Sequence, residues 1–170
     1  MNLTTLNLYS LDYRQPRAYV LAAAFVAGNI VLPQLCHLVP QGGLILLPIY
    51  FFTLIAAYKY GWRVGLLTAI ASPVVNSALF GMPAPAVLPI ILIKSTLLAL
   101  AAAFAADRFK KASLPLLIAV VLGYQVVGSV IESLIAGSWN AGFQDFRIGV
   151  PGMALQIFGG WAIINYVLRR

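Results

Sequence analysis

The sequence predicts an all-α integral membrane protein in which six transmembrane helices form one bundle and both termini are cytoplasmic. Of its 170 residues, 62% are hydrophobic and 9% are charged. That composition excludes a water-soluble domain of this size. The apolar runs are continuous and rich in Ala, Leu and Ile, so helices are favoured over the alternating strands of a membrane barrel. The basic residues gather on one side of the predicted spans, which sets the orientation.

Six apolar segments account for nearly the whole chain and define the predicted helices. A hydrocarbon core requires roughly 20 apolar residues per spanning helix. The segments that approach this length are residues 17–33, 44–60, 62–80, 86–106, 114–136 and 151–168. No soluble domain is left over, so we expect a single domain over residues 1–170. The stretch Met1 to Tyr13 is polar and lacks the apolar run of a cleavable signal peptide.

The connections separate these helices in order along the chain. Loop 1, Pro33 to Gly43, contains two prolines and two glycines and is therefore first of all a turn. A glycine-bearing turn at Gly61 follows the second helix, and the loop FGMPAPA follows the third. A short cationic connection joins the fourth and fifth helices. Loop 5, Gly137 to Val150, mixes aromatic and polar side chains, as expected of a lid over a flat, partly polar ligand. These side chains are Trp139, Asn140, Phe143, Gln144, Asp145, Phe146 and Arg147.

The distribution of basic residues predicts which side of the membrane each connection faces. Lys94 falls inside a span, and Arg147 is alone among the basic residues on the predicted outer side. The inner side carries Arg14, Arg17, Lys59, Arg63, Arg108, Lys110, Lys111, Arg169 and Arg170. The positive-inside rule then places both termini in the cytoplasm, for a multi-pass protein of the bacterial cytoplasmic (inner) membrane. No nucleic-acid partner is expected, because the basic residues form no stripe with interleaved aromatics.

Polar residues inside the spans are concentrated toward the predicted outer face. A lysine or aspartate at mid-helix costs about 2.5–3.5 kcal/mol on insertion scales, so those that remain require a reason. Lys94 lies about 12 Å and Glu132 about 6 Å from the outer ends of their helices, an offset that a lysine side chain can span. This pair either serves a ligand or forms a neutral buried pair, and Glu132 can alternatively point into the headgroup region.

The polar residues inside the spans, together with the outer loops, predict a polar pocket at or just beneath the outer surface. The candidate substrate-binding residues are Asn76, Lys94, Gln125, Glu132, Trp139, Gln156, His37 and Cys36. Other interpretations stay open. Buried amides and hydroxyls also serve as hydrogen-bonding partners between membrane helices. Trp139 also fits the aromatic belt at the membrane interface.

The motifs of common enzyme classes are missing from the sequence. It contains no HExxH, GxSxG or Walker-type loop, and nothing in the spacing brings Glu132, His37 and Cys36 together. We therefore expect no enzymatic activity, no catalytic residues, no metal site and no intrinsic cofactor. The single cysteine cannot form an internal disulfide.

Small residues line the first predicted helix at intervals of four. Such surfaces let another helix approach closely. The candidate partner interface consists of Ala18, Ala22, Ala23 and Ala27. These alanines can equally pack within their own bundle, since alanine is plentiful elsewhere in the chain.

Four features of the sequence belong together: the helix count, the alanine surface, the long loop 1 and the run PIYFFTLIAAYKYGWRVGLLTAIASPVVNSALFGMP, residues 48–83. In this combination the chain resembles the substrate-binding S components of energy-coupling factor (ECF) vitamin transporters. The resemblance covers essentially the full chain but is one of architecture. It implies high-affinity binding of a vitamin-like micronutrient between the outer ends of helices 4 to 6 and loops 1, 3 and 5. It also implies association through helix 1 with a transmembrane coupling protein and two ATPases, followed by toppling that delivers the ligand inward.

The same resemblance bears on the identity of the ligand. Some solitary family members meet the metal of a corrinoid or haem with a cysteine or histidine, so Cys36 and His37 make those ligands candidates beside vitamins. A rival interpretation is a structural scaffold that resembles the rod-shape protein MreD, which has a comparable size and helix count. A small channel is disfavoured because the polar stripes are concentrated toward one membrane face.

Overall fold

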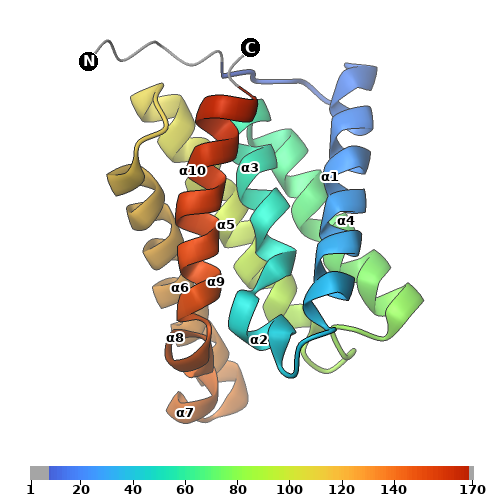
Figure 1. Ribbon diagram of the computed structural model, residues 1–170, viewed down its shortest axis with the longest axis vertical. Helices are drawn as coiled ribbons and strands as arrows, with labels where there is room; N and C mark the ends of the chain where they lie inside the picture. The colour runs from blue at the N-terminus through green and yellow to red at the C-terminus, as the bar shows by residue number, and fades with distance from the viewer. Residues whose placement is uncertain (1–7, 169–170) are drawn as a thin grey trace.

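The computed structural model describes residues 8–168, and all of the regular structure in that range is helical. Four long helices run along one common direction (Figure 1). They are α1 (Pro16–Cys36), α4 (Trp62–Phe80), α5 (Leu88–Phe109) and α6 (Leu114–Ala136). A fifth helical rod runs from Val150 to Val167 and consists of α9 (Val150–Ala154), the π-helix η2 (Leu155–Gly159), α10 (Gly160–Ala162) and the π-helix η3 (Ile163–Val167).

These five rods are long and apolar enough to cross a membrane. Each is at least 18 residues long, which matches the thickness of a hydrocarbon core. They correspond to five of the six predicted spans, with ends shifted by a few residues. The chain is therefore a multi-pass helical membrane protein.

The second predicted span, residues 44–60, is not one continuous helix. It is divided into α2 (Gly42–Leu46), the 3-10 turn η1 (Pro48–Tyr50) and α3 (Phe51–Tyr60). The break has a local cause, because Leu47 adopts a left-handed conformation with φ of 46° and Pro48 has no amide hydrogen to continue the helix. With 10 residues, α3 is only about 15 Å long. The predicted count of six spanning helices is thus not confirmed.

The short helix α3 forms the centre of the molecule. It contacts α1, α4 and α5, and its residues from Thr53 to Lys59 are all buried. Close approach is possible because Gly65 of α4 lies directly against Ala57, and Gly28 of α1 lies against the ring of Phe52. Around this helix the larger core includes Leu98, Leu117 and Ile164.

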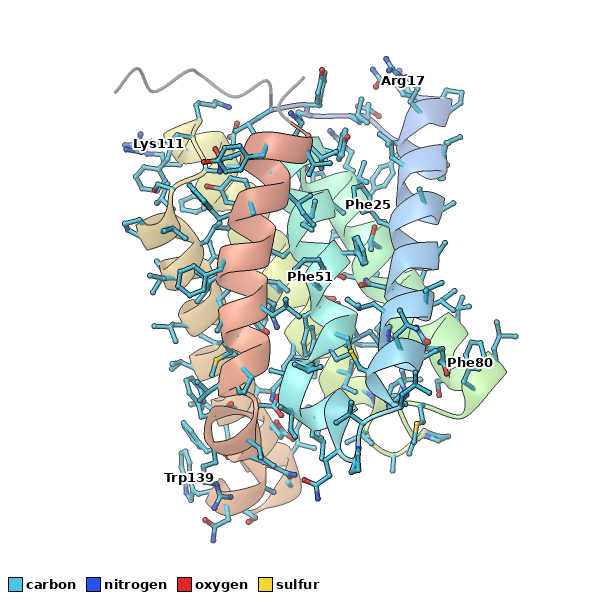
Figure 2. The ribbon with its side chains drawn as sticks, in the orientation of Figure 1. Arg17, Phe25, Phe51, Phe80, Lys111 and Trp139 are labelled. Carbon is cyan, nitrogen blue, oxygen red and sulfur yellow. The ribbon has the colours of Figure 1, made fainter. Side chains whose placement is uncertain are left out.

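The two ends of the bundle differ in charge. Arg17 and Lys111 lie at one end, and Phe80 and Trp139 at the other (Figure 2). We call the first the basic end and the second the loop end. The chain before α1 crosses the basic end, where Tyr9 N–H donates to the Lys59 carbonyl at 2.9 Å. Of the predicted inner-side residues, Arg17, Lys59 and Lys111 lie at this end, and Arg169 and Arg170 fall outside the described residues. The cytoplasmic location of this end stays a prediction.

Candidate functional site

The central feature of the loop end is a buried ion cluster around Lys94. Lys94 lies in α5, two turns from the first residue of that helix, and its side chain is only 2% exposed. Its Nζ atom is 2.6 Å from Oε2 of Glu132 in α6 and 2.7 Å from Oδ2 of Asp145. Asp145 belongs to the short helix α8 (Gln144–Ile148). One ammonium group thus joins three segments, and we call Lys94, Glu132 and Asp145 the Lys94 cluster.

A glycine in α6 makes room for this lysine. A Cβ atom at Gly128 would lie 2.6 Å from Cγ of Lys94, closer than real side chains approach one another. Gln125, Gly128, Ser129 and Glu132 follow i, i+3, i+4, i+7 spacing and therefore share one face of α6. The lysine stem passes along that face to reach Glu132. The local sequence of α6 accordingly supplies both the space and the counter-charge.

Asp145 belongs to a cap that covers the loop end of α6. The cap comprises α7 (Trp139–Gly142) and α8, and it lies below α6 and α9 in the view of Figure 1. Gly142 lies directly against Ser133 of α6, and a Cβ at Gly149 would lie 2.7 Å from the side chain of Leu47. Ser138 caps α7 by accepting a hydrogen bond from the amide of Ala141. Close contacts at both glycines hold the cap against the bundle, which fixes the position of the Asp145 carboxylate.

Buried polar atoms without a hydrogen-bonding partner in the described part of the chain flank the Lys94 cluster. Gln125 is fully buried, and neither Nε2 nor Oε1 of its amide has a partner there. Ser95 and Ser129, which adjoin Lys94 and Gly128 in sequence, are fully buried with unpartnered hydroxyls. Leaving such a group unsatisfied costs about 1–3 kcal/mol, so native structures rarely do it without a reason.

The C-terminal rod contributes to the same polar region. The Tyr124 hydroxyl donates to Oε1 of Gln156 at 2.9 Å, which links α6 to η2 and leaves Nε2 of Gln156 without a partner among residues 8–168. The ring of Tyr124 lies 5.6 Å from that of Tyr50. Gln156 is in a π-helical segment, a distortion that is frequent at functional sites. We call Gln125, Ser95, Ser129 and Gln156 the unpartnered set.

Asn76 lies in a different polar region, between α1, α3 and α4. Asn29 Nδ2 donates to Oγ1 of Thr53 at 3.1 Å and to Oγ of Ser72 at 3.0 Å. Its Oδ1 accepts from the Phe52 amide, and Asn76 Nδ2 donates to the Asn29 carbonyl at 2.9 Å. We call this the Asn29 network. Asn29 is fully paired in this network, whereas Oδ1 of Asn76 has no partner among residues 8–168. The hydrogen bonds of Asn76 reach Asn29 and Ser72, and none reaches Lys94.

The remaining predicted site residues occupy the surface and the first turn. Trp139 is 64% exposed and packs beside Phe143, with ring centroids 6.0 Å apart. Cys36 is buried at the end of α1, where its carbonyl accepts from the Val39 amide. His37 is exposed, and its imidazole lies beside Gly43. Among residues 8–168, no group of three or more His, Cys, Asp or Glu side chains is arranged to hold a metal ion.

The predicted alanine interface is divided by the structure. Ala18 and Ala22 are buried in a small cluster with Ala56 and Val64, so they pack inside the bundle and offer no surface to a partner. Their burial corrects that half of the prediction. Ala23 and Ala27 are exposed.

Two open hollows of about 370 and 440 Å³ lie at the basic end, and both include Tyr9 in their lining. The fully buried Lys59 is close by, with Nζ 5.3 Å from the centre of the Tyr9 ring. This cation–π contact gives the ammonium a favourable neighbour. The linings also include the charged residues Arg17, Asp107 and Lys110. We take the loop end as the better candidate site because a lysine held by two carboxylates lies there.

Comparisons of the chain with family models, with curated proteins and with solved structures find no match. The site must therefore be interpreted from its own geometry.

Sequence reasoning brings Lys94, Glu132, Gln125 and Gln156 toward one region, and the structure places them in adjoining elements. It does not connect Asp145 with Lys94, because it treats Asp145 only as part of the lid. The sequence did contain a signal. The chain has only four acidic residues, and two of them, Glu132 and Asp145, lie on the predicted outer side, where both could reach a lysine inside the span. The structure assigns two of those four to Lys94.

Proposed function

We propose that this chain is the substrate-binding membrane subunit of an importer for a small, water-soluble, vitamin-like solute. The solute binds at the loop end, against the Lys94 cluster and the unpartnered set. The single observation that carries the proposal is Gln125, a fully buried side chain whose amide nitrogen and oxygen both lack partners in the described chain.

The argument rests on what buried polar groups require. A membrane interior holds little water, so an amide there must find a partner or remain unsatisfied at a cost. Asn29 shows that this fold can pair every polar atom of a buried amide that connects helices. Gln125 carries the same amide group, but neither its nitrogen nor its oxygen has a partner in the described chain. A ligand with donors and acceptors would supply the partners that the protein itself does not.

The cap provides the second part of the proposal. It is built from short helices and carries Asp145 into the cluster, so its release would uncover Lys94 and the face of α6 behind it. The resemblance to ECF S components supports the same location. Under this proposal the chain binds and does not catalyse, and inward delivery requires a transmembrane coupling protein and paired ATPases. The exposed Ala23 and Ala27 of α1 are the remaining candidates for that contact.

The test is a search for bound solute combined with a matched pair of variants. Mass spectrometry of the gently extracted protein is followed by thermal-shift screening with vitamins, corrinoids, haem and modified bases. We expect at least one compound to raise Tm in the wild type and to lose that effect in Gln125→Met, which keeps the volume and removes the amide. Val127→Leu is the control, because Val127 is 48% exposed and lies on the opposite face of the same helix.

Two outcomes would count against the proposal. If no compound is retained and none raises Tm, a structural scaffold explains the bundle better. If a compound binds equally well to Gln125→Met, the site lies elsewhere. A Gln125→Met protein that is more stable than the wild type without ligand, with binding lost, supports the proposal, since the buried amide then costs stability and serves affinity.

A further inference from the structure

We infer that the solute bound at the loop end carries a positive charge. This inference rests on the proposed function and specifies the class of its substrate. It starts from the composition of the Lys94 cluster, in which one ammonium group contacts two carboxylates at 2.6 and 2.7 Å. With all three groups ionised, the cluster has a net charge of −1.

No other cation in the described chain neutralises this surplus. Arg147, in the same cap, is exposed and donates to the carbonyl of Asn140. Arg17 and Lys111 lie at the basic end (Figure 2). Arg63 pairs with Asp12, Lys110 pairs with Asp107, and Lys59 lies over the ring of Tyr9. An uncompensated charge away from water is costly, and a bound cation would remove that cost.

The accessible side of the cluster is the negative side. The Lys94 side chain is 2% exposed, whereas those of Glu132 and Asp145 are each 17% exposed. A solute that approaches from the loop end therefore meets the carboxylates first and the ammonium group behind them. The contacts with Lys94 use Oε2 of Glu132 and Oδ2 of Asp145, so the second oxygen of each carboxylate can accept a hydrogen bond from a ligand.

Two further features suit a cation. Tyr50 lies close enough to Glu132 and Asp145 to interact with them electrostatically, and its ring lies beside that of Tyr124. Aromatic faces attract cations in addition to the charge pairing. Oε1 of Gln125 is an acceptor without a partner among residues 8–168. An anionic solute, by contrast, would meet the two carboxylates before the nearly buried ammonium group and would be repelled by them.

The experiment uses three probes that share one ring and differ in charge: benzylammonium, benzyl alcohol and benzoate. Binding to the full chain in detergent is measured by thermal shift and by calorimetry at millimolar concentrations. We expect benzylammonium to bind at least about tenfold more tightly than either other probe, as one additional charge pair in a partly desolvated site suffices for that ratio.

Variants locate the effect. Asp145→Asn and Glu132→Gln each bring the cluster to net zero, so each should reduce the preference for benzylammonium to below about threefold. Asp107→Asn is the matched control, because Asp107 is exposed at the basic end, where it pairs with Lys110. It should leave the preference unchanged. Using two cluster variants keeps the test valid if one of them fails to fold.

The inference is overturned if benzoate or benzyl alcohol binds as well as benzylammonium, if no probe binds, or if both cluster variants keep the full preference. Its failure is distinguishable from that of the proposed function. A neutral or anionic vitamin that raises Tm in the wild type and not in Gln125→Met would leave the binding function standing and reject the cationic class. Absence of any bound solute in that screen would reject both.

Discussion

Two buried amides show how differently this bundle treats the same chemical group. Asn29, between α1, α3 and α4, uses both donors and its acceptor in hydrogen bonds of 3.0–3.2 Å. Gln125, in α6, is equally buried and has no partner in the described chain for either end of its amide. The first lies in a neutral region, and the second lies beside an ion cluster with surplus negative charge.

The contrast distinguishes polar side chains that connect helices from polar side chains that we propose bind a ligand. Hydrogen bonds such as those of Asn29 connect membrane helices, and they need no further occupant. The unpartnered set costs stability as it stands, and this cost is the reason why we propose that a ligand completes its hydrogen bonds. Mutations in the two regions should therefore have different signatures: stability alone in the Asn29 network, and affinity with stability in the Lys94 cluster.

The largest effect is expected for Lys94→Met. Removing the ammonium leaves two carboxylates facing each other with no counter-charge, and breaking a buried ion pair in this way costs about 3–5 kcal/mol. We expect a loss of that order in the free energy of unfolding, measured by detergent titration in mixed micelles. A cationic solute should restore part of it, because it supplies the missing counter-charge.

A triple variant distinguishes the two roles of the cluster. Lys94→Met, Glu132→Gln and Asp145→Asn together remove every charge, and we expect most of the lost stability to return while solute binding is lost. If the triple variant still binds the solute, the cluster is structural and the comparison with the Asn29 network no longer holds.

A second prediction concerns the space that α6 leaves for Lys94. The Cβ of Gly128→Ala would lie 2.6 Å from Cγ of Lys94, so the lysine stem must shift away from its carboxylates. Overpacking of this kind costs about 1–3 kcal/mol, and it should weaken solute binding in proportion to the displacement of Nζ. Gly123→Ala is the matched control: Gly123 is in the same helix, and nothing lies within 4 Å of its Cβ position. Because alanine favours a helix over glycine, that control should gain up to about 1 kcal/mol. Equal effects of the two substitutions would show that helix propensity, and not contact with Lys94, sets the result.

Much of the architecture follows from the sequence because burial in lipid imposes long apolar runs. Five predicted spans match helices of the structure. The depths of Lys94 and Glu132 in two adjacent spans put the carboxylate within reach of the lysine, and the structure shows that the two side chains pair. Charge placement likewise predicts a basic end. These features depend on composition over many residues or on helical rise, and both are visible without tertiary information.

The remaining features depend on tertiary context. The run 44–60 is apolar throughout, and its division at Leu47 and Pro48 follows from a left-handed residue that hydropathy does not reveal. Asp145 reaches Lys94 only because the cap folds back on α6, a connection with no sequence periodicity. Ala18 and Ala23 are indistinguishable by residue type, yet one is buried and the other exposed, since this is decided by how α1 rotates against α3.

The smallest expected effect is in the Asn29 network. Asn29→Ala removes three side-chain hydrogen bonds, and at about 0.6 kcal/mol for an average polar contact between membrane helices this amounts to about 2 kcal/mol at most. Solute affinity should not change, because none of the three bonds reaches α5, α6 or the cap. The matched control is Ala27→Ser, which places a polar group on the exposed face of the same helix and should alter neither stability nor affinity by much. A fall in solute affinity in Asn29→Ala that exceeds its loss of stability would mean that the two regions are coupled through α3, and would make Asn76 part of the binding site after all.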